Sequence, residues 1–185
     1  MEIVDQIQSL CRVALTPLEH VAQNGVKQIL TIDIDCADLP EWEIDFKGKY
    51  KTIFNTKYNL TGPAFYWFEV VSPTRIINII ANINGYMAFE DFKALPAMKK
   101  TLDHSTKVLY LGKVKRDIWG RIVQHLGFYH VKLTQGLQLF HWCSGLDLKL
   151  KLHIYEFEND MTGLMPVIEN GMAKHLNPLL GKHLK

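Results

Sequence analysis

The sequence predicts one α+β domain, a small mixed sheet flanked by helices, preceded by an N-terminal extension. Two observations indicate this class. Of the 185 residues, 48% are hydrophobic, which is enough for one packed core. From about residue 60 onward, segments with strand-like and helix-like patterns alternate. Gly62-Pro63 lies where the pattern changes, and we divide the chain into residues 1–58 and 59–185.

Residues 1–58 predict helices followed by one strand. A first amphipathic helix is indicated by four side chains that share one face: Ile3, Ile7, Leu10 and Cys11. The segment Thr16-Pro17-Leu18-Glu19 has the pattern of a capping box, which predicts a second helix ending at Gly25. Residues 29–35 alternate apolar and polar side chains, as a half-buried strand does. This part contains no chemical motif, and we expect it to bind a partner or to position DNA.

Residues 59–185 predict three strands alternating with three helices. The strands are expected at residues 64–71, 107–112 and 146–157, and the helices at 73–83, 117–126 and 166–176. Between them, residues 84–105 are polar and irregular. In the last strand, leucine and isoleucine alternate with Lys149, Lys151 and His153, which predicts one buried and one basic face.

The charge distribution is uneven although the net charge is only +2. Residues 104–151 carry 8 basic and 2 acidic side chains, which favours a surface that contacts phosphates; an ordinary solvated face is the alternative. No apolar run is long enough to cross a membrane. Three widely spaced cysteines favour a reducing compartment, and we expect a cytoplasmic protein.

The predicted helix at residues 117–126 holds the first candidate pair. Arg121 and His125 lie one turn apart, beside the apolar face of this helix. A guanidinium is suited to phosphate oxygens, and an imidazole can hold or move a proton near neutral pH. The alternative is a surface arginine paired with Asp117 and a histidine without a role.

The last helix and the two aromatic strands supply the other candidates. Glu169 sits within an apolar stripe, where a carboxylate is costly unless it pairs with a cation or binds a metal such as Mg²⁺ or Mn²⁺. A nearby lysine or arginine is the alternative partner. Tyr66 and Tyr110 lie in the first two strands, where a tyrosine is often a core residue with a hydrogen-bonded hydroxyl.

The order of these pieces resembles the GIY-YIG nuclease family. Residues 64–66 (AFY) would match the first motif, and residues 110–112 (YLG) the second. The stretch YLGKVKRDIWGRIVQH resembles the second-motif strand running into the helix with its arginine and histidine. The stretch VIENGMAKHLNPLL resembles the terminal helix with its metal-binding glutamate. The resemblance covers roughly residues 60–185 and makes residues 72–105 an insertion between the motifs.

The resemblance implies a hydrolytic site with one divalent cation, Mg²⁺ or Mn²⁺. Glu169 would bind the cation, and Arg121 would hold the scissile phosphate. Tyr66, helped by His125, would orient or deprotonate the attacking water, and Tyr110 would contact the water or the phosphate. Candidates for contacts with the nucleic-acid backbone are Lys113, Lys115, Arg116, Lys149 and Lys151.

The expected function is therefore metal-dependent endonuclease activity, with DNA as the preferred substrate. The alternative is an inactive GIY-YIG-like module that binds nucleic acid or protein, because the motifs are altered: Ala64 replaces the first-motif glycine. The sequence leaves the oligomeric state open.

Overall fold

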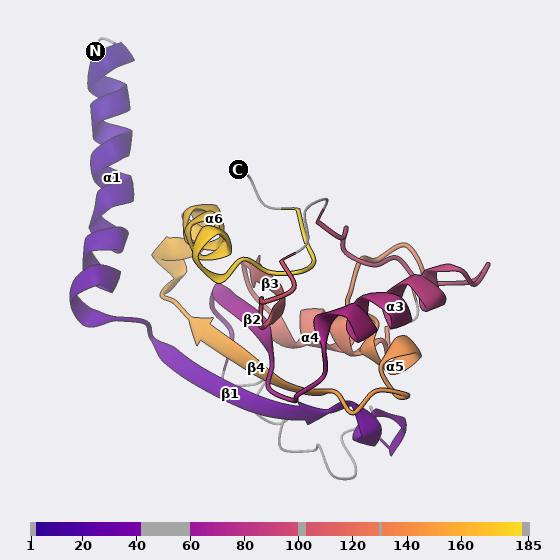
Figure 1. Cartoon of the computed structure of the whole chain (residues 1–185). Coiled ribbons are helices and arrows are strands. Elements are labelled where there is room, and N and C mark those ends of the chain that lie inside the picture. The colour runs from indigo at the N-terminus through magenta and orange to yellow at the C-terminus, as the bar shows by residue number, and fades with distance from the viewer. Residues whose placement is uncertain (1–2, 42–59, 100–102, 130, 183–185) are drawn as a thin grey trace.

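The chain folds around one antiparallel sheet with helices on both faces (Figure 1). This computed structural model describes residues 3–41, 60–99, 103–129 and 131–182, so residues 42–58 of the predicted extension lie outside the described residues. The elements are α1 (Ile3–Asn24), β1 (Gln28–Asp35), η1 (Cys36–Glu41), β2 (Ala64–Val70), α3 (Ile76–Met87), β3 (Val108–Val114), α4 (Ile118–Leu126), α5 (Leu139–Trp142), β4 (Lys149–Glu156), η3 (Asn159–Gly163) and α6 (Met165–Leu176). The predicted α+β class is confirmed.

The four strands follow the order β1-β4-β2-β3. All three neighbouring pairs are antiparallel, whereas the sequence predicts a mixed sheet. The predicted strands are confirmed, and they differ from the observed ones by a few residues at their ends. β1 pairs with β4 along its whole length, from Gln28 opposite Glu156 to Asp35 opposite Lys149. The N-terminal part of the chain therefore supplies an edge strand to the same sheet that carries both tyrosine motifs.

The predicted break in the N-terminal helix at Thr16 is wrong. α1 is a single helix of 22 residues that contains Pro17. The Thr16 hydroxyl donates backward to the Arg12 carbonyl at 3.3 Å, so it does not cap a new helix. Pro17 costs the helix one backbone hydrogen bond, and the packing of the following turns on the body offsets this loss. The predicted stop is confirmed by Gly25, which has a positive φ of 81°.

α3 begins later than predicted. The sequence places its start at Ser72-Pro73, but the helix begins at Ile76 and extends to Met87. The Ser72 hydroxyl bonds the Thr74 hydroxyl at 2.8 Å rather than a helix amide, and Thr74 bonds the Asp147 carbonyl. The first part of the predicted insertion is thus a helix that belongs to the core.

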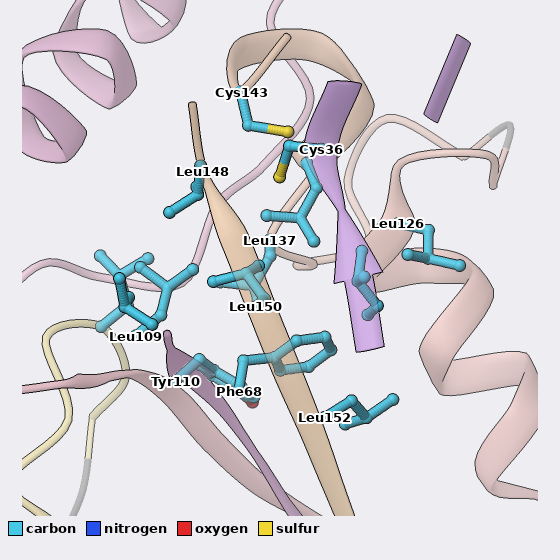
Figure 2. Close-up of a cluster of buried hydrophobic side chains, with 14 of the residues drawn as sticks. Cys36, Phe68, Leu109, Tyr110, Leu126, Leu137, Cys143, Leu148, Leu150 and Leu152 are labelled. Carbon is cyan, nitrogen blue, oxygen red and sulfur yellow. The ribbon is translucent and has the colours of Figure 1, made fainter. Parts of the chain in front are cut away.

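Two hydrophobic clusters cover the two faces of the sheet. The larger lies between the sheet and α3, α4 and α5, and Figure 2 shows Phe68, Tyr110 and Leu152 among its side chains. The smaller lies on the other face, where Phe65 and Leu111 cluster with Met165 of α6, and Leu18 and Val21 of α1 pack against this cluster. No helix in the described residues is both long and apolar enough to cross a membrane.

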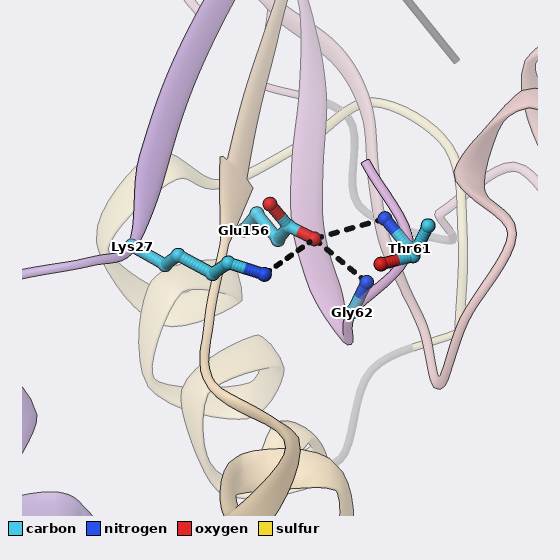
Figure 3. Close-up of polar contacts among 4 residues, drawn as sticks. All are labelled: Lys27, Thr61, Gly62 and Glu156. Carbon is cyan, nitrogen blue, oxygen red and sulfur yellow. Dashed lines mark hydrogen bonds and ion pairs between the residues drawn. The ribbon is translucent and has the colours of Figure 1, made fainter. Parts of the chain in front are cut away.

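A buried carboxylate at the end of β4 binds the segment that leads into β2. Glu156, the last residue of β4, accepts hydrogen bonds through Oε1 from the backbone amides of Thr61 at 2.9 Å and Gly62 at 2.7 Å (Figure 3). Lys27 Nζ approaches the same oxygen at 3.5 Å. A Cβ atom at Gly62 would lie 2.7 Å from the Phe157 carbonyl oxygen, so only glycine fits this close approach. These contacts fix where β2 begins, and β2 carries Tyr66.

Candidate functional site

The structure brings four of the five predicted site residues into one cluster and places the fifth nearby. Tyr66 on β2 and Tyr110 on β3 point toward α4, which carries Arg121 and His125. Glu169 on α6 lines the same pocket as Tyr110 and Arg121. The cluster forms because β2 and β3 are adjacent in the sheet, so the long chain segment between the two motifs does not separate the tyrosines.

Gly112 makes room for both tyrosine hydroxyls. It lies opposite Tyr66 in the β2–β3 register. A Cβ atom at this position would lie 2.8 Å from the Tyr66 hydroxyl oxygen and 3.0 Å from that of Tyr110. Real Cβ atoms do not approach so closely, so the missing side chain allows the two hydroxyls to meet beside α4.

His125 is fully buried, and its hydrogen-bond partners define its tautomer. Its Nδ1 accepts a hydrogen bond from the Leu137 backbone amide at 3.1 Å, so Nδ1 carries no hydrogen. Burial, and then the nearby charge of Arg121, lower the pKa of His125 well below its usual value, which keeps the ring neutral. The single ring hydrogen is therefore on Nε2 and is donated to the Tyr66 hydroxyl oxygen at 2.9 Å.

Tyr66 is held as a neutral phenol inside the protein. Its hydroxyl oxygen accepts from His125 Nε2 and from Arg121 Nε, the latter at 3.3 Å. Burial raises the pKa of Tyr66 well above its usual value, and the proximity of Tyr110 raises it further, while Arg121 opposes both effects. The Tyr66 side chain has no exposed surface, so its hydroxyl contacts protein groups and does not line the pocket.

Arg121 connects this buried cluster to the pocket. Its Nη1 donates to the Gln124 side chain at 2.7 Å and to the Gln135 carbonyl at 2.6 Å. Its Nη2 lies 3.4 Å from the Tyr110 hydroxyl, a long hydrogen bond. The predicted alternative, a surface arginine paired with Asp117, is wrong, because these bonds turn the guanidinium toward the strands.

A pocket of about 260 Å³ opens in front of Arg121. Gln135, Gly181 and Lys182 line it together with the predicted residues Tyr110, Arg121 and Glu169. Leu95, Pro96 and Ala97 form the remaining wall. Tyr66 and His125 are not part of the lining and lie behind Tyr110 and Arg121.

Glu169 forms an ion pair with Lys113 of β3. The Glu169 side chain is 17% exposed and that of Lys113 is 31% exposed, and of the two Glu169 is the one that lines the pocket. The lysine partner is the alternative that the apolar stripe predicts for this carboxylate. A metal ion at Glu169 would therefore compete with the Lys113 ammonium group.

Among the described residues, Glu169 is the one carboxylate in the lining of the pocket, so a hard cation at this position would take its other ligands from water and substrate. Mg²⁺ is commonly held by one or two carboxylates together with substrate phosphates and water. Glu169 offers one such carboxylate beside Tyr110. Within the described part of the chain, no group of three or more His, Cys, Asp or Glu side chains is placed to hold a metal ion without such help.

The predicted backbone-contact cations do not form one continuous strip. Lys115 and Arg116 are exposed in the turn between β3 and α4. Lys149 and Lys151 of β4 lie 3.4 Å and 3.8 Å from the carboxylates of Asp35 and Asp33 on β1. The predicted basic face of β4 is thus partly neutralised, because β1 brings carboxylates beside it. On the same face, Trp67 stacks between His153 and Tyr155.

Sequence reasoning missed two residues that line the pocket and the role of a third residue beside it. Gln135 and Lys182 belong to irregular segments that carry no motif, and no periodicity indicates their place. The role of Lys113 as the partner of Glu169 was not identified, although Lys113 itself was singled out as a phosphate contact.

Comparison of the chain with family models, curated proteins and solved structures found no match.

Proposed function

We propose that this chain is a metal-dependent nuclease that resembles the GIY-YIG family and hydrolyses nucleic-acid phosphodiester bonds, with DNA as the preferred substrate. One observation carries the proposal: Tyr110, Arg121 and Glu169 line one pocket, although they come from β3, α4 and α6. Phosphodiester hydrolysis requires a group for the attacking water, a donor for the phosphate oxygens and a cation for the leaving oxygen. The proposed compartment is the cytoplasm.

Each residue has a role that follows from its position. Arg121 binds a non-bridging phosphate oxygen with the Nη2 hydrogen that its bonds to Tyr66, Gln124, Gln135 and Tyr110 leave over. Glu169 would hold Mg²⁺ or Mn²⁺, and the cation, when bound, would supply a Lewis acid for the leaving 3′ oxygen. Tyr110 contacts the attacking water, because it is the tyrosine that lines the pocket. The buried Tyr66 and the neutral His125 hold Tyr110 and Arg121 in place.

The alternative is an inactive binding module with the same pocket. The ion pair between Glu169 and Lys113 favours this alternative, because it satisfies the carboxylate without a metal. In that case Arg121 and Lys182 would bind phosphate groups without cleaving the chain.

The test is cleavage of a panel of plasmid DNA, branched DNA and structured RNA in Mg²⁺, Mn²⁺ or EDTA, using wild type and Glu169→Ala. Metal-dependent cleavage that Glu169→Ala abolishes would support the nuclease, and the best substrate would define its class. Salt-sensitive binding without cleavage of any substrate would instead support the inactive module.

A further inference from the structure

The first half of α1 stands away from the body of the protein (Figure 1). Six large apolar side chains within residues 3–15 are each more than half exposed: Ile3, Val4, Ile7, Leu10, Val13 and Leu15. In the second half, Leu18 and Val21 continue the same stripe and pack against the cluster beneath α6. The stripe is therefore buried at one end by its own chain and unpartnered at the other, where an isolated amphipathic helix is only marginally stable.

The charged side chains of α1 identify what kind of surface can cover this stripe. At 100° per residue, Asp5, Arg12 and Glu19 all fall on the side of the helix away from Ile3, Ile7 and Leu10. The positions that flank the stripe carry no charge: Val4, Gln6, Cys11 and Val13. Charges at such flanking positions select or reject partner helices. An identical helix meets no like charge here.

The apolar stripe of α1 is also complementary to the same stripe on a second α1 that runs antiparallel to it. Ile3, Ile7, Leu10 and Ala14 recur at alternating spacings of four and three residues, the spacing of a helix-pair seam. If two copies cross with their midpoints at residues 8 and 9, Ile7 faces Leu10 of the partner subunit, and the large Ile3 faces the small Ala14 of the partner subunit. The two helix dipoles then run in opposite directions, which is the favourable arrangement.

We propose that the chain forms a two-fold symmetric homodimer in which the exposed half of α1 packs antiparallel against α1 of a second copy. The same patch serves on both subunits, as a two-fold interface requires. The pocket between β3, α4 and α6 contains no residue of α1, so this inference does not rest on the proposed function.

The test is the molar mass of the full chain by light scattering coupled to gel filtration, over concentrations up to about 100 μM. Wild type is expected at twice the chain mass of 21.3 kDa. Leu10→Glu places a carboxylate in the seam and is expected to weaken dimerisation by at least about 100-fold, giving monomers. Ser9→Glu adds the same charge to the far side of the same helix and is expected to remain dimeric.

Circular dichroism and thermal unfolding would establish that both variants keep the wild-type fold, since neither residue belongs to a core cluster. A monomeric wild type would overturn the proposal and leave a different protein as the occupant of the stripe. A dimer that Leu10→Glu does not weaken would also overturn it, because the interface would then lie elsewhere on the molecule.

Discussion

At the scale of single residues, the candidate site depends on side chains whose partners come from distant parts of the sequence. Arg121 and His125 were predicted from their spacing on one helix, and both reach the predicted tyrosines. Which of the two tyrosines lines the pocket could not be predicted in this way. Tyr66 and Tyr110 have similar strand environments in the sequence, and only the position of α4 buries Tyr66 completely.

Lys113 is expected to weaken metal binding at Glu169, because its ammonium group occupies the position next to the carboxylate. Lys113→Met removes this competing charge and retains most of the aliphatic chain. We expect Mn²⁺ to bind roughly tenfold more tightly to this variant in the absence of nucleic acid. Electron paramagnetic resonance of free Mn²⁺ would measure the change. The control is Lys115→Met in the exposed turn, and equal Mn²⁺ affinity in the two variants would contradict the competition.

Gly112 is expected to tolerate a side chain poorly. Gly112→Ala introduces a Cβ atom at 2.8 Å from the Tyr66 hydroxyl oxygen, and we expect a loss of about 1–3 kcal/mol in the free energy of unfolding. Adding Tyr66→Phe removes the clashing oxygen, so the double variant should lose less than the sum of the two single losses. Urea unfolding measures all three. Gly120→Ala, where the nearest atom is 3.8 Å away, is the control and should not destabilise α4.

The lowered pKa of His125 is expected to make the free energy of unfolding depend on pH. Its pKa in the folded protein lies well below its usual value, whereas the unfolded chain binds a proton below about pH 6.5. The unfolded state then holds more protons, so stability falls as pH decreases, by at most about 1.4 kcal/mol per pH unit from this residue. Urea unfolding at pH 7.5 and 5.5 should show a shallower loss for His125→Gln than for wild type. Equal losses would mean that His125 is charged in the folded state.

At the scale of elements, periodicity predicted which segments are strands and helices but not how they are joined. The alternation in residues 29–35 and 146–157 is local, so both strands were predicted. Their pairing is not local, and it is this pairing that places Asp33 and Asp35 beside Lys151 and Lys149. The single helix α1 was mispredicted for the same reason. Pro17 reads as a helix start in the sequence, and only the packing of Leu18 and Val21 on the body explains why the helix continues.

Glu156 is expected to hold the start of β2 through backbone amides rather than through Lys27. Glu156→Ala leaves the amides of Thr61 and Gly62 without an acceptor, and we expect a loss of about 2–4 kcal/mol in the free energy of unfolding. Lys27→Met removes a partner that is 39% exposed and should cost no more than about 1 kcal/mol. Urea unfolding of both variants would compare them. A larger loss in Lys27→Met would show that the ion pair, and not the amide bonds, is decisive.

At the scale of the whole molecule, the sheet joins the N-terminal part to the site, while the first half of α1 remains outside the body. The α+β class was predictable because the alternation of strand and helix patterns is strong after residue 60. The shape of the pocket was not, since Leu95, Gln135 and Lys182 come from irregular segments brought together at the edge of β3. Their placement depends on long-range contacts, such as the hydrogen bond from the Leu180 amide to the Leu109 carbonyl at 2.9 Å.

The central claim is that the pocket lined by Tyr110, Arg121 and Glu169 hydrolyses phosphodiesters with a divalent cation. The most direct test is the single-turnover cleavage rate of the best substrate at saturating Mg²⁺, for wild type, Glu169→Gln and Glu158→Gln. Glu169→Gln keeps the size of the side chain and removes its charge, and we expect a rate lower by on the order of 10²-fold or more. Glu158→Gln removes an exposed carboxylate outside the pocket and should cleave like wild type. Equal rates in all three proteins would contradict the claim.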